Sequence, residues 1–336
     1  MNAADLASSC HAATVAPQPR GQIRPATRSE SRPPRLSVVI ASINGREVLE
    51  PTLDALDAQT IRDEMEILVV EAVGGATRAH LAERLPVVRV IPVQERMSIP
   101  RLRALGGRAA TGDVVAILED HVAVVPGWAE AIVAAFEQTD DPTLAAVGGP
   151  VLNGRRGWVD RAAFLTEYTP FLPPLQPRDP AAVPNLAGNN IAYRRAWLER
   201  HLDLLEQGRW ESWINAAILR QGGRLEARDA AAVRHIKPFT LADFLTQRFW
   251  FCRSFAGMRR ADQSPVVRLI HIAGSPLLPA LLLARIARAV WIDKRPGHRA
   301  DFLACLPLIL LFLTVGAAGE LVGYLWGTGG SLERVE

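Results

Sequence analysis

The sequence contains very little cysteine, and the cysteines it has do not form a recognisable site. The three of them, Cys10, Cys252 and Cys305, are spread far apart over 336 residues. Disulfide-rich domains need many paired cysteines, and structural zinc sites need ligands at short spacings. The sequence therefore gives no sign of a disulfide framework or a structural zinc site, and it fits a reducing compartment.

Two further features are scarce. The formal net charge is only +3, and basic residues do not form a run interleaved with aromatics, so nucleic acid is not an expected partner. Residues 1–34 lack the apolar run of a secretory signal, so the sequence gives no sign of export. They are rich in Ala, Ser, Pro and Arg without hydrophobic periodicity, and we predict a disordered tail there.

The part of the chain after residue 34 shows alternating strand and helix patterns. Short apolar runs lie at 36–41, 66–70, 87–90 and 114–118, and segments with helical spacing separate them at 47–59, 80–85 and 98–110. This alternation is typical of a mostly parallel sheet with helices on both faces. We therefore predict an α/β fold. We also predict strands at 145–151 and 225–233, and an irregular Pro-rich loop at 152–184.

Polar residues follow the predicted strands at the points where the strands end. Asn44 follows the first strand, Glu71 follows the second, and Glu119, Asp120 and His121 follow the fourth. Open α/β sheets bind their ligands at the carboxyl ends of the strands. Carboxylates and imidazoles are common ligands of divalent metals. The sequence thus predicts a metal and phosphate corner of an active site.

The stretch from Arg35 to Arg260 resembles a family 2 glycosyltransferase with the GT-A fold. The motifs that carry the resemblance occur in the order of that family. They are Leu-Ser-Val-Val-Ile-Ala-Ser at 36–42, Arg-Leu-Arg-Ala-Leu-Gly at 101–106, Ala-Thr-Gly-Asp at 110–113, Glu-Asp-His at 119–121, Gly-Asn-Asn-Ile-Ala-Tyr-Arg-Arg at 188–195 and Arg-Gln-Gly-Gly at 220–223. The resemblance implies a GT-A, Rossmann-like sheet, a nucleotide-sugar donor and a divalent metal, Mg²⁺ or Mn²⁺.

The resemblance also implies roles for individual residues. Glu-Asp-His at 119–121 stands where the family has Asp-x-Asp, so Asp120 is the expected metal ligand, with His121 and His235 as further ligands. The register on Arg220–Gly223 places Glu211 at the catalytic carboxylate, as general base. The expected donor-binding residues are Ser42, Asn44, Glu71, Arg103, Glu119, Asn189 and Asn190.

Structural alternatives stay open for several of these residues. His121 would then only orient Asp120, and His235 would be a buried structural histidine. Glu211 would be a charge at the start of a helix, which the helix dipole favours. Glu71 would be a turn residue.

Two apolar stretches near the end of the sequence predict contact with a membrane. Residues 302–319 carry no charge, and the stretch continues to Trp326, which is long enough to span a bilayer. Residues 269–284 are broken by glycine and prolines, and basic residues at 285–299 follow them, which the positive-inside rule places in the cytoplasm. We predict that 302–326 crosses alone, with 327–336 outside, and that 269–284 dips into the cytoplasmic leaflet. The alternatives are a two-span hairpin and a buried core helix.

The sequence therefore predicts three regions and one main function. Residues 1–34 form a tail, 35–260 a GT-A catalytic domain and 261–336 a membrane-associated region. The predicted enzyme is attached to the cell (inner) membrane with its catalytic domain cytoplasmic, and it transfers a single sugar from a nucleotide sugar to a lipid-linked or saccharide acceptor, inverting and metal-dependent. Transfer of one sugar is expected because the Gln-x-x-Arg-Trp motif of processive synthases has only an approximate echo at 247–250.

Two other functions are compatible with the same motifs. A nucleotidyltransferase on a related sheet should carry a Gly-rich phosphate loop after the first strand, but residues 42–46 hold one glycine. An inactive, membrane-tethered nucleotide-sugar-binding module is the other possibility, because both acidic motifs depart from the family pattern.

Overall fold

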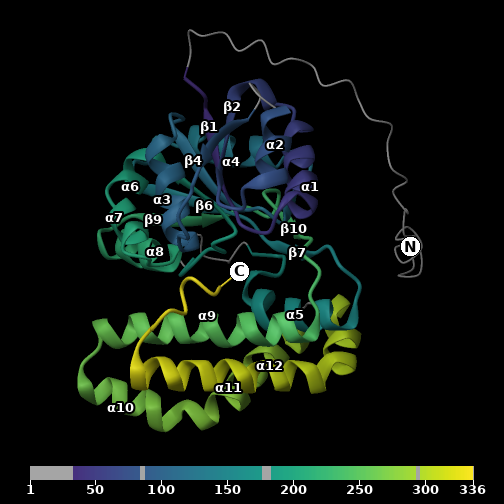
Figure 1. The fold of residues 1–336 in the computed structure, drawn as a ribbon, viewed down its shortest axis with the longest axis vertical. Coiled ribbons are helices and arrows are strands. Elements are labelled where there is room, and N and C mark those ends of the chain that lie inside the picture. Colours follow the sequence, from purple (N-terminus) through teal and green to yellow (C-terminus); the bar gives the residue numbers. More distant parts are fainter. Residues whose placement is uncertain (1–32, 84–87, 176–182, 293–295, 336) are drawn as a thin grey trace, which may run out of the picture.

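The computed structural model describes residues 33–83, 88–175, 183–292 and 296–335. The tail predicted for residues 1–34 lies almost wholly outside these ranges. The described chain forms an α/β unit with a layer of long helices beneath it (Figure 1).

A seven-stranded sheet forms the centre of the α/β unit, in the order β3-β2-β1-β4-β8-β6-β9. The strands are β1 (Leu36–Ser42), β2 (Met65–Glu71), β3 (Arg89–Pro92), β4 (Val114–Glu119), β6 (Leu144–Gly148), β8 (Asn190–Arg194) and β9 (Arg224–Ala227). β8 runs antiparallel to β4 and β6, and the other pairings are parallel. The predicted mostly parallel α/β sheet is confirmed.

Helices cover both faces of this sheet because its central strands are apolar on both sides. All seven residues of β1 and of β2 are buried, as in parallel sheets enclosed between two helical layers. One layer contains α1 (Arg46–Asp57), α2 (Gly75–Glu83) and α4 (Trp128–Glu137). The other contains α3 (Ile99–Ala109), α6 (Arg195–Glu199), α7 (Leu202–Glu206) and α8 (Glu211–Arg220). A short 3₁₀ helix, η1 (Arg62–Glu64), leads into β2.

A second, three-stranded sheet has the order β5-β10-β7, with β5 (Val122–Val124), β7 (Val151–Asn153) and β10 (Val233–His235). Each of the strands predicted at 145–151 and 225–233 is therefore wrong as a single element, because the chain passes from one sheet to the other within it. Gly149 marks the first crossing, where an added Cβ would lie 1.8 Å from the Ala231 carbonyl oxygen. The β5–β10 pairing sets His235 beside Val122 and hence near His121.

The irregular loop predicted for residues 152–184 is wrong over part of its length. It contains α5 (Trp158–Tyr168) and the 3₁₀ turn η2 (Thr169–Phe171). The prolines that dominate the composition begin only at Pro170, after the helix has ended. α5 buries Ala162, Ala163 and Leu165 in a cluster with residues of the C-terminal helices.

The layer beneath the sheet consists of α9 (Leu241–Asp262), α10 (Pro265–Gly274), η4 (Ser275–Leu277), α11 (Leu278–Trp291), η5 (Pro296–His298) and α12 (Arg299–Trp326). Figure 1 shows α9 and α12 running side by side. Small residues permit this close packing: a Cβ added at Gly319 would lie 2.4 Å from the Phe249 carbonyl oxygen. Two segments, Pro265–Trp291 and Arg299–Trp326, are long and apolar enough to cross a membrane.

Both the start of α12 and the segment after its end contact the α/β unit. Near its start, Asp301 accepts a hydrogen bond from Arg161 of α5 at 2.7 Å. After its end, the Glu333 carbonyl oxygen accepts one from Arg96 at 3.1 Å. A helix that crosses a bilayer alone would separate these two contacts by the membrane. The prediction that residues 327–336 lie on the far side is therefore wrong: α12 lies along α9, and the chain returns.

Candidate active site

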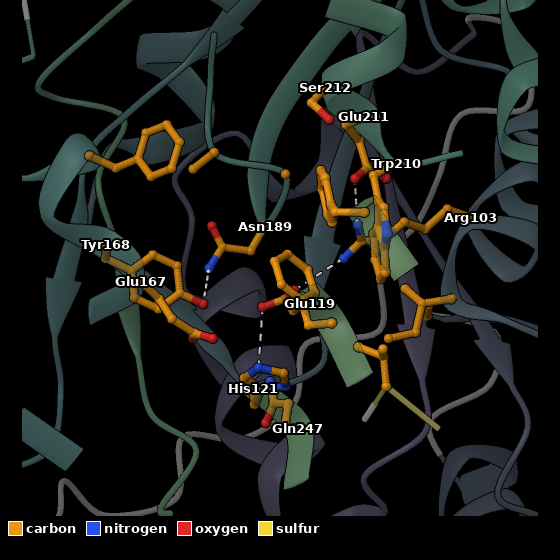
Figure 2. A pocket seen from close by; sticks show the side chains of 18 of the residues that line it. Arg103, Glu119, His121, Glu167, Tyr168, Asn189, Trp210, Glu211, Ser212 and Gln247 are labelled. Atoms are coloured by element: carbon orange, nitrogen blue, oxygen red, sulfur yellow. Dashed lines mark hydrogen bonds and ion pairs between the residues drawn. The ribbon is translucent and has the colours of Figure 1, made fainter. Parts of the chain in front are cut away.

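A cavity of about 210 Å³ lies between the carboxyl ends of the central strands and the helix α9. Figure 2 shows its side chains, which come from α3, α5, α8, α9 and the turns after β1 and β4. Its lining includes Asn44, Arg103, Glu119, Asp120, His121, Glu167, Tyr168, Asn189, Trp210, Glu211, Ser212, Gln247 and Arg248. Many residues predicted from the sequence thus lie together at one edge of the sheet.

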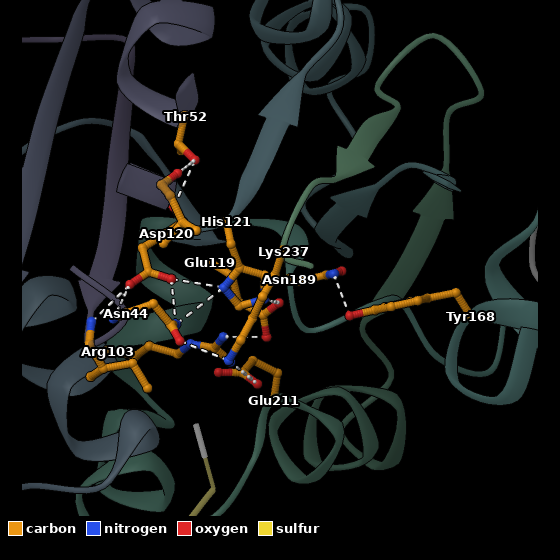
Figure 3. Close-up of polar contacts among 12 residues, drawn as sticks. Asn44, Thr52, Arg103, Glu119, Asp120, His121, Tyr168, Asn189, Glu211 and Lys237 are labelled. Atoms are coloured by element: carbon orange, nitrogen blue, oxygen red, sulfur yellow. Dashed lines mark hydrogen bonds and ion pairs between the residues drawn. The ribbon is translucent and has the colours of Figure 1, made fainter. Parts of the chain in front are cut away.

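Asp120 is held by donors on both of its carboxylate oxygens. Its Oδ2 accepts hydrogen bonds from the backbone N–H groups of Ile43 at 2.8 Å and Asn44 at 2.9 Å. Its Oδ1 accepts one from the Asn44 side chain at 2.9 Å and lies 2.8 Å from Nδ1 of His121 (Figure 3). Burial opposes its ionisation, but these contacts hold the pKa of Asp120 below its ordinary value. Asp120 therefore ties the turn after β1 to His121.

Arg103 links two carboxylates inside the cavity. It lies on α3, and its side chain is 1% exposed. Its Nη1 is 2.8 Å from Glu211 Oε2, and its Nη2 is 3.3 Å from Glu119 Oε1 (Figure 2). Burial alone would lower the pKa of Arg103, but the two carboxylates raise it, so the guanidinium stays charged. The other oxygen of Glu211, Oε1, is buried and has no hydrogen-bond partner in the described chain.

Glu119, His121 and His235 form a charged cluster beside this bridge. His121 Nε2 lies 3.2 Å from Glu119 Oε2, and the two imidazole rings are 5.0 Å apart. Burial opposes charge on His121, but Glu119 and Asp120 raise its pKa to about 9. Burial and the neighbouring charge of His121 lower the pKa of His235 to about 3, which leaves that ring neutral. A protonated His121 thus supplies the cation between two carboxylates.

The residue types of this cluster are ones that bind divalent metals in proteins. The cluster offers one carboxylate and two imidazoles, which suit first-row divalent ions. Glu119 Oε2 is buried, and its ion-pair partner is His121 Nε2 at 3.2 Å, so a metal would take the place of the proton on that ring. Within the described ranges, no group of three or more His, Cys, Asp or Glu side chains is arranged to hold a metal ion. Because metal-bound histidine is neutral, binding would release the proton that His121 carries.

The remaining predicted donor-binding residues divide into two groups. Asn189 lines the cavity, where it donates to the Tyr168 hydroxyl at 3.1 Å while its own Oδ1 is buried without a partner. Asn190 instead holds the fold together, through Trp128 and the Ala231 carbonyl.

Ser42 and Glu71 are fully buried and do not belong to the cavity lining. The carboxylate of Glu71 is occupied by the backbone of Val73 and by Arg78 at 2.7 Å each, as in the turn-residue alternative. The roles of Ser42, Glu71 and Asn190 in donor binding stay predictions.

Sequence reasoning missed polar residues of α5 and α9 that line the cavity, and it missed Lys237, which contacts a lining residue from the segment before α9. Glu167 is buried, and desolvation raises its pKa to about 7; Arg248 lies 3.9 Å from it. Lys237 donates to the Asn44 side chain at 2.7 Å. The misjudged loop at 152–184 concealed Glu167 and Tyr168. The imperfect motif at 247–250 was the one available signal for Arg248.

A comparison with protein families gives one match to the catalytic unit. The family described as glycosyl transferase family 2 matches residues 37–202, which run from β1 to α7. Residues 37–202 form a glycosyl transferase family 2 domain. This result confirms the family to which the sequence motifs pointed, and it covers the strand ends that build the cavity.

The family 2 chain is also similar to individual proteins. Probable polypeptide N-acetylgalactosaminyltransferase 8 of Homo sapiens is 31% identical over 120 residues, which are 32% of this chain and 19% of that protein. Polypeptide N-acetylgalactosaminyltransferase 12 of Mus musculus is 26% identical over 238 residues, 61% of this chain and 40% of that protein. This chain thus spans well under half the length of these curated relatives.

A solved structure supports the GT-A-like fold. It is the mannosyltransferase PcManGT from Pyrobaculum calidifontis, in complex with GDP-Man and Mn²⁺. The two proteins are 21% identical, the match covers 88% of each chain, and the TM-score is 0.56. The predicted GT-A-like α/β architecture is therefore confirmed. Because the match covers 88% of this chain, it must include most of the C-terminal helices as well.

Proposed function

We propose that this family 2 chain transfers a single sugar from a nucleotide-sugar donor to a lipid-linked or saccharide acceptor, with inversion and with a divalent metal. The observation that carries the proposal is the bridge through Arg103. It places a carboxylate suited to a base, Glu211, and a carboxylate suited to a metal, Glu119, on one buried guanidinium. Leaving-group stabilisation and acceptor deprotonation, the two requirements of glycosyl transfer, thus have candidate groups in one cavity.

We assign the metal to Glu119, His121 and His235. A divalent ion bound there would neutralise the diphosphate leaving group. The Pyrobaculum calidifontis mannosyltransferase is in complex with Mn²⁺, which supports the same requirement here. Asp120 then has the supporting role, because both of its oxygens are occupied and its contact with Nδ1 orients the His121 ring. This assignment exchanges the roles that the sequence gave to Asp120 and Glu119.

We assign the general base to Glu211. It is the first residue of α8 and is 2% exposed. Arg103 holds one oxygen, and the unpartnered Oε1 remains to accept a proton from an acceptor hydroxyl. Gly188 makes room for the carboxylate, since a Cβ there would lie 2.7 Å from Glu211 Oε2. Asn189, with a free buried oxygen, is placed to accept from a sugar hydroxyl of either substrate.

We also propose that the enzyme works at a membrane surface. The exposed faces of α10 and of the turn η4 present large apolar side chains: Val266 is 68% exposed and Leu277 is 72% exposed. Arg285 and Arg288 on α11 are exposed beside them and suit anionic headgroups. Because both ends of α12 contact the catalytic unit, we place the helical layer in the plane of the membrane. A lipid-linked acceptor would then reach the cavity from below.

The proposal is tested with the full chain in detergent and a panel of nucleotide sugars. We expect one donor to be hydrolysed slowly when Mn²⁺ is present, and hydrolysis to stop when the metal is chelated. Glu119→Gln should remove both Mn²⁺ binding and hydrolysis, whereas Glu137→Gln, the same change on the exposed side of α4, should leave both unaltered. Binding of a nucleotide sugar without turnover of any donor would instead favour the inactive binding module.

A further inference from the structure

The segment that follows α12 turns back from the helical layer towards the sheet (Figure 1). Arg96 holds it through the Glu333 carbonyl oxygen at 3.1 Å, and Arg334 lies 4.6 Å from the centre of the Trp250 ring. Val335 is 6% exposed. Its apolar cluster contains Ala41, Val70, Ile99, Leu102, Trp210 and Met258, with Leu332 packed at the edge. The segment is therefore packed into the catalytic unit.

The position of Val335 coincides with the nucleotide end expected for this fold. Ala41 and Val70 are the penultimate residues of β1 and β2, and α/β sheets hold nucleotides at these carboxyl ends. Val335 also lines the cavity that contains Arg103 and Glu119. The cluster that buries Val335 and the proposed donor site are thus continuous.

The cavity is smaller than usual ligand pockets while this segment lines it. Its volume is about 210 Å³. Pockets that enclose ligands of this size usually measure about 300–1,000 Å³. Side chains of the sheet and of α3 belong to regular secondary structure, whereas residues 331–335 lie in no helix or strand and are held by Arg96 and by the packing of Leu332 and Val335. The segment is therefore the part of the wall that can leave.

We infer that residues 331–335 are an autoinhibitory strap over the nucleoside end of the donor site, and that a nucleotide-sugar donor must displace it. This inference rests on the proposed function. Two apolar side chains, Leu332 and Val335, and the Arg96 contact hold the strap closed. If the open state amounts to about 10% of the molecules, the strap weakens the apparent donor affinity about tenfold.

The strap is tested by binding of UDP and GDP, each with Mn²⁺, to the full chain in detergent and to a chain that ends at Ser331. Val335→Asp serves as a second opening variant, because a carboxylate is disfavoured in the apolar cluster. Glu333→Ala is the control, since its side chain is exposed and Arg96 contacts only its backbone oxygen. We expect about tenfold tighter binding of one diphosphate by both opening variants and no change in the control.

Equal or weaker binding by the opening variants would overturn the strap and leave the proposed function intact. Binding of neither diphosphate by any variant would overturn both. Maleimide modification gives an independent readout, followed by mass spectrometry at Val335→Cys and at the exposed control Gly330→Cys. We expect slow modification at position 335 that accelerates when the bound diphosphate is added. Equal rates at both positions would contradict a closed strap.

Discussion

At the scale of single residues, the site depends on how carboxylates are shared among cations. Arg103 forms ion pairs with Glu119 and Glu211, and a protonated His121 forms ion pairs with Glu119 and Asp120. Each carboxylate is left in a different state by these contacts. Asp120 is occupied on both oxygens, and Glu119 is ion-paired on both, to Arg103 and to His121, while Glu211 keeps one buried oxygen without a hydrogen bond. The unpaired oxygen identifies Glu211 as the carboxylate that can still accept a proton, and a metal would bind Glu119 in exchange for the His121 proton.

Glu211→Gln removes the proposed base but keeps the shape of the side chain. We expect the turnover number to fall about a hundredfold or more at saturating donor, because general base catalysis contributes 10²–10⁴. Donor affinity should change little, since Arg103 retains Glu119 as a partner. Steady-state kinetics on the variant measures both values. Glu206→Gln on α7 is the matched control; a parallel loss of donor binding by Glu211→Gln would show a structural role instead.

Glu167→Gln tests the buried carboxyl on α5 through its pH dependence. Its pKa is raised from 4.5 to about 7 by desolvation. Between these values the native state keeps a proton that the unfolded state has lost, so native stability falls as the pH rises through this window. The variant lacks this penalty. We expect the melting temperature of the variant, relative to the unmodified chain, to rise by several degrees from pH 5 to pH 8. A pH-independent difference would contradict the raised pKa.

At the scale of elements, the packing of α9 on α12 decides where the cavity floor lies. Phe244 and Phe312 touch with ring centres 4.4 Å apart, and glycines of α12 lie directly against the backbone of α9. The same helix carries Gln247, Arg248 and Phe251 into the cavity. Through these two sets of contacts, α9 connects the apolar helices to the cavity.

Gly319→Ala should separate the two helices. Its Cβ would lie 2.4 Å from the Phe249 carbonyl oxygen, so backbone must move, and overpacking of this kind costs about 1–3 kcal/mol. We expect a lower melting temperature and weaker donor binding, because α9 carries part of the cavity wall. Gly274→Ala, in a helix where nothing lies within 4 Å of the new Cβ, is the control and should not lower the melting temperature. Equal melting temperatures of the two variants would contradict close α9–α12 packing.

At the scale of the whole molecule, the structure is a catalytic α/β unit resting on a layer of helices. The layer is apolar on its outer side and carries the cavity on its inner side. Within this layer, α10 and α11 carry exposed apolar side chains, and α9 lines the cavity. The strap after α12 adds a further contact between the helical layer and the α/β unit, through Arg96 and the Glu333 carbonyl oxygen.

Attachment to lipid is tested by flotation of the full chain with vesicles containing phosphatidylglycerol. We expect binding that decreases in the double variant Leu269→Glu and Leu277→Glu, whose side chains are 65% and 72% exposed on the outer side of the layer. Leu105→Glu introduces the same change on the exposed side of α3 and should bind normally. Undiminished binding of the double variant would show that another surface makes the contact.

The sequence by itself determined the elements whose signal is local. Strands such as β1 and β4 are continuous apolar runs, and the motifs at 101–106, 188–195 and 220–223 identified the family before any contact was known. The residues at strand ends were found for the same reason, since topology alone brings Asn44 and Glu119 to one edge of a parallel sheet.

Only the tertiary structure decided which contacts each of those residues makes, and hence which role it can take. Asp120 and Glu119 are neighbours in sequence, but hydrogen bonds from the turn after β1 hold Asp120, whereas Glu119 is ion-paired with Arg103 and His121. The direction of α12 was also hidden, because hydropathy counts apolar residues without showing what they face. The glycines of α12 allow it to pack closely against the backbone of α9. The strap that follows α12 reaches the strand ends through a contact between residues more than two hundred positions apart in sequence.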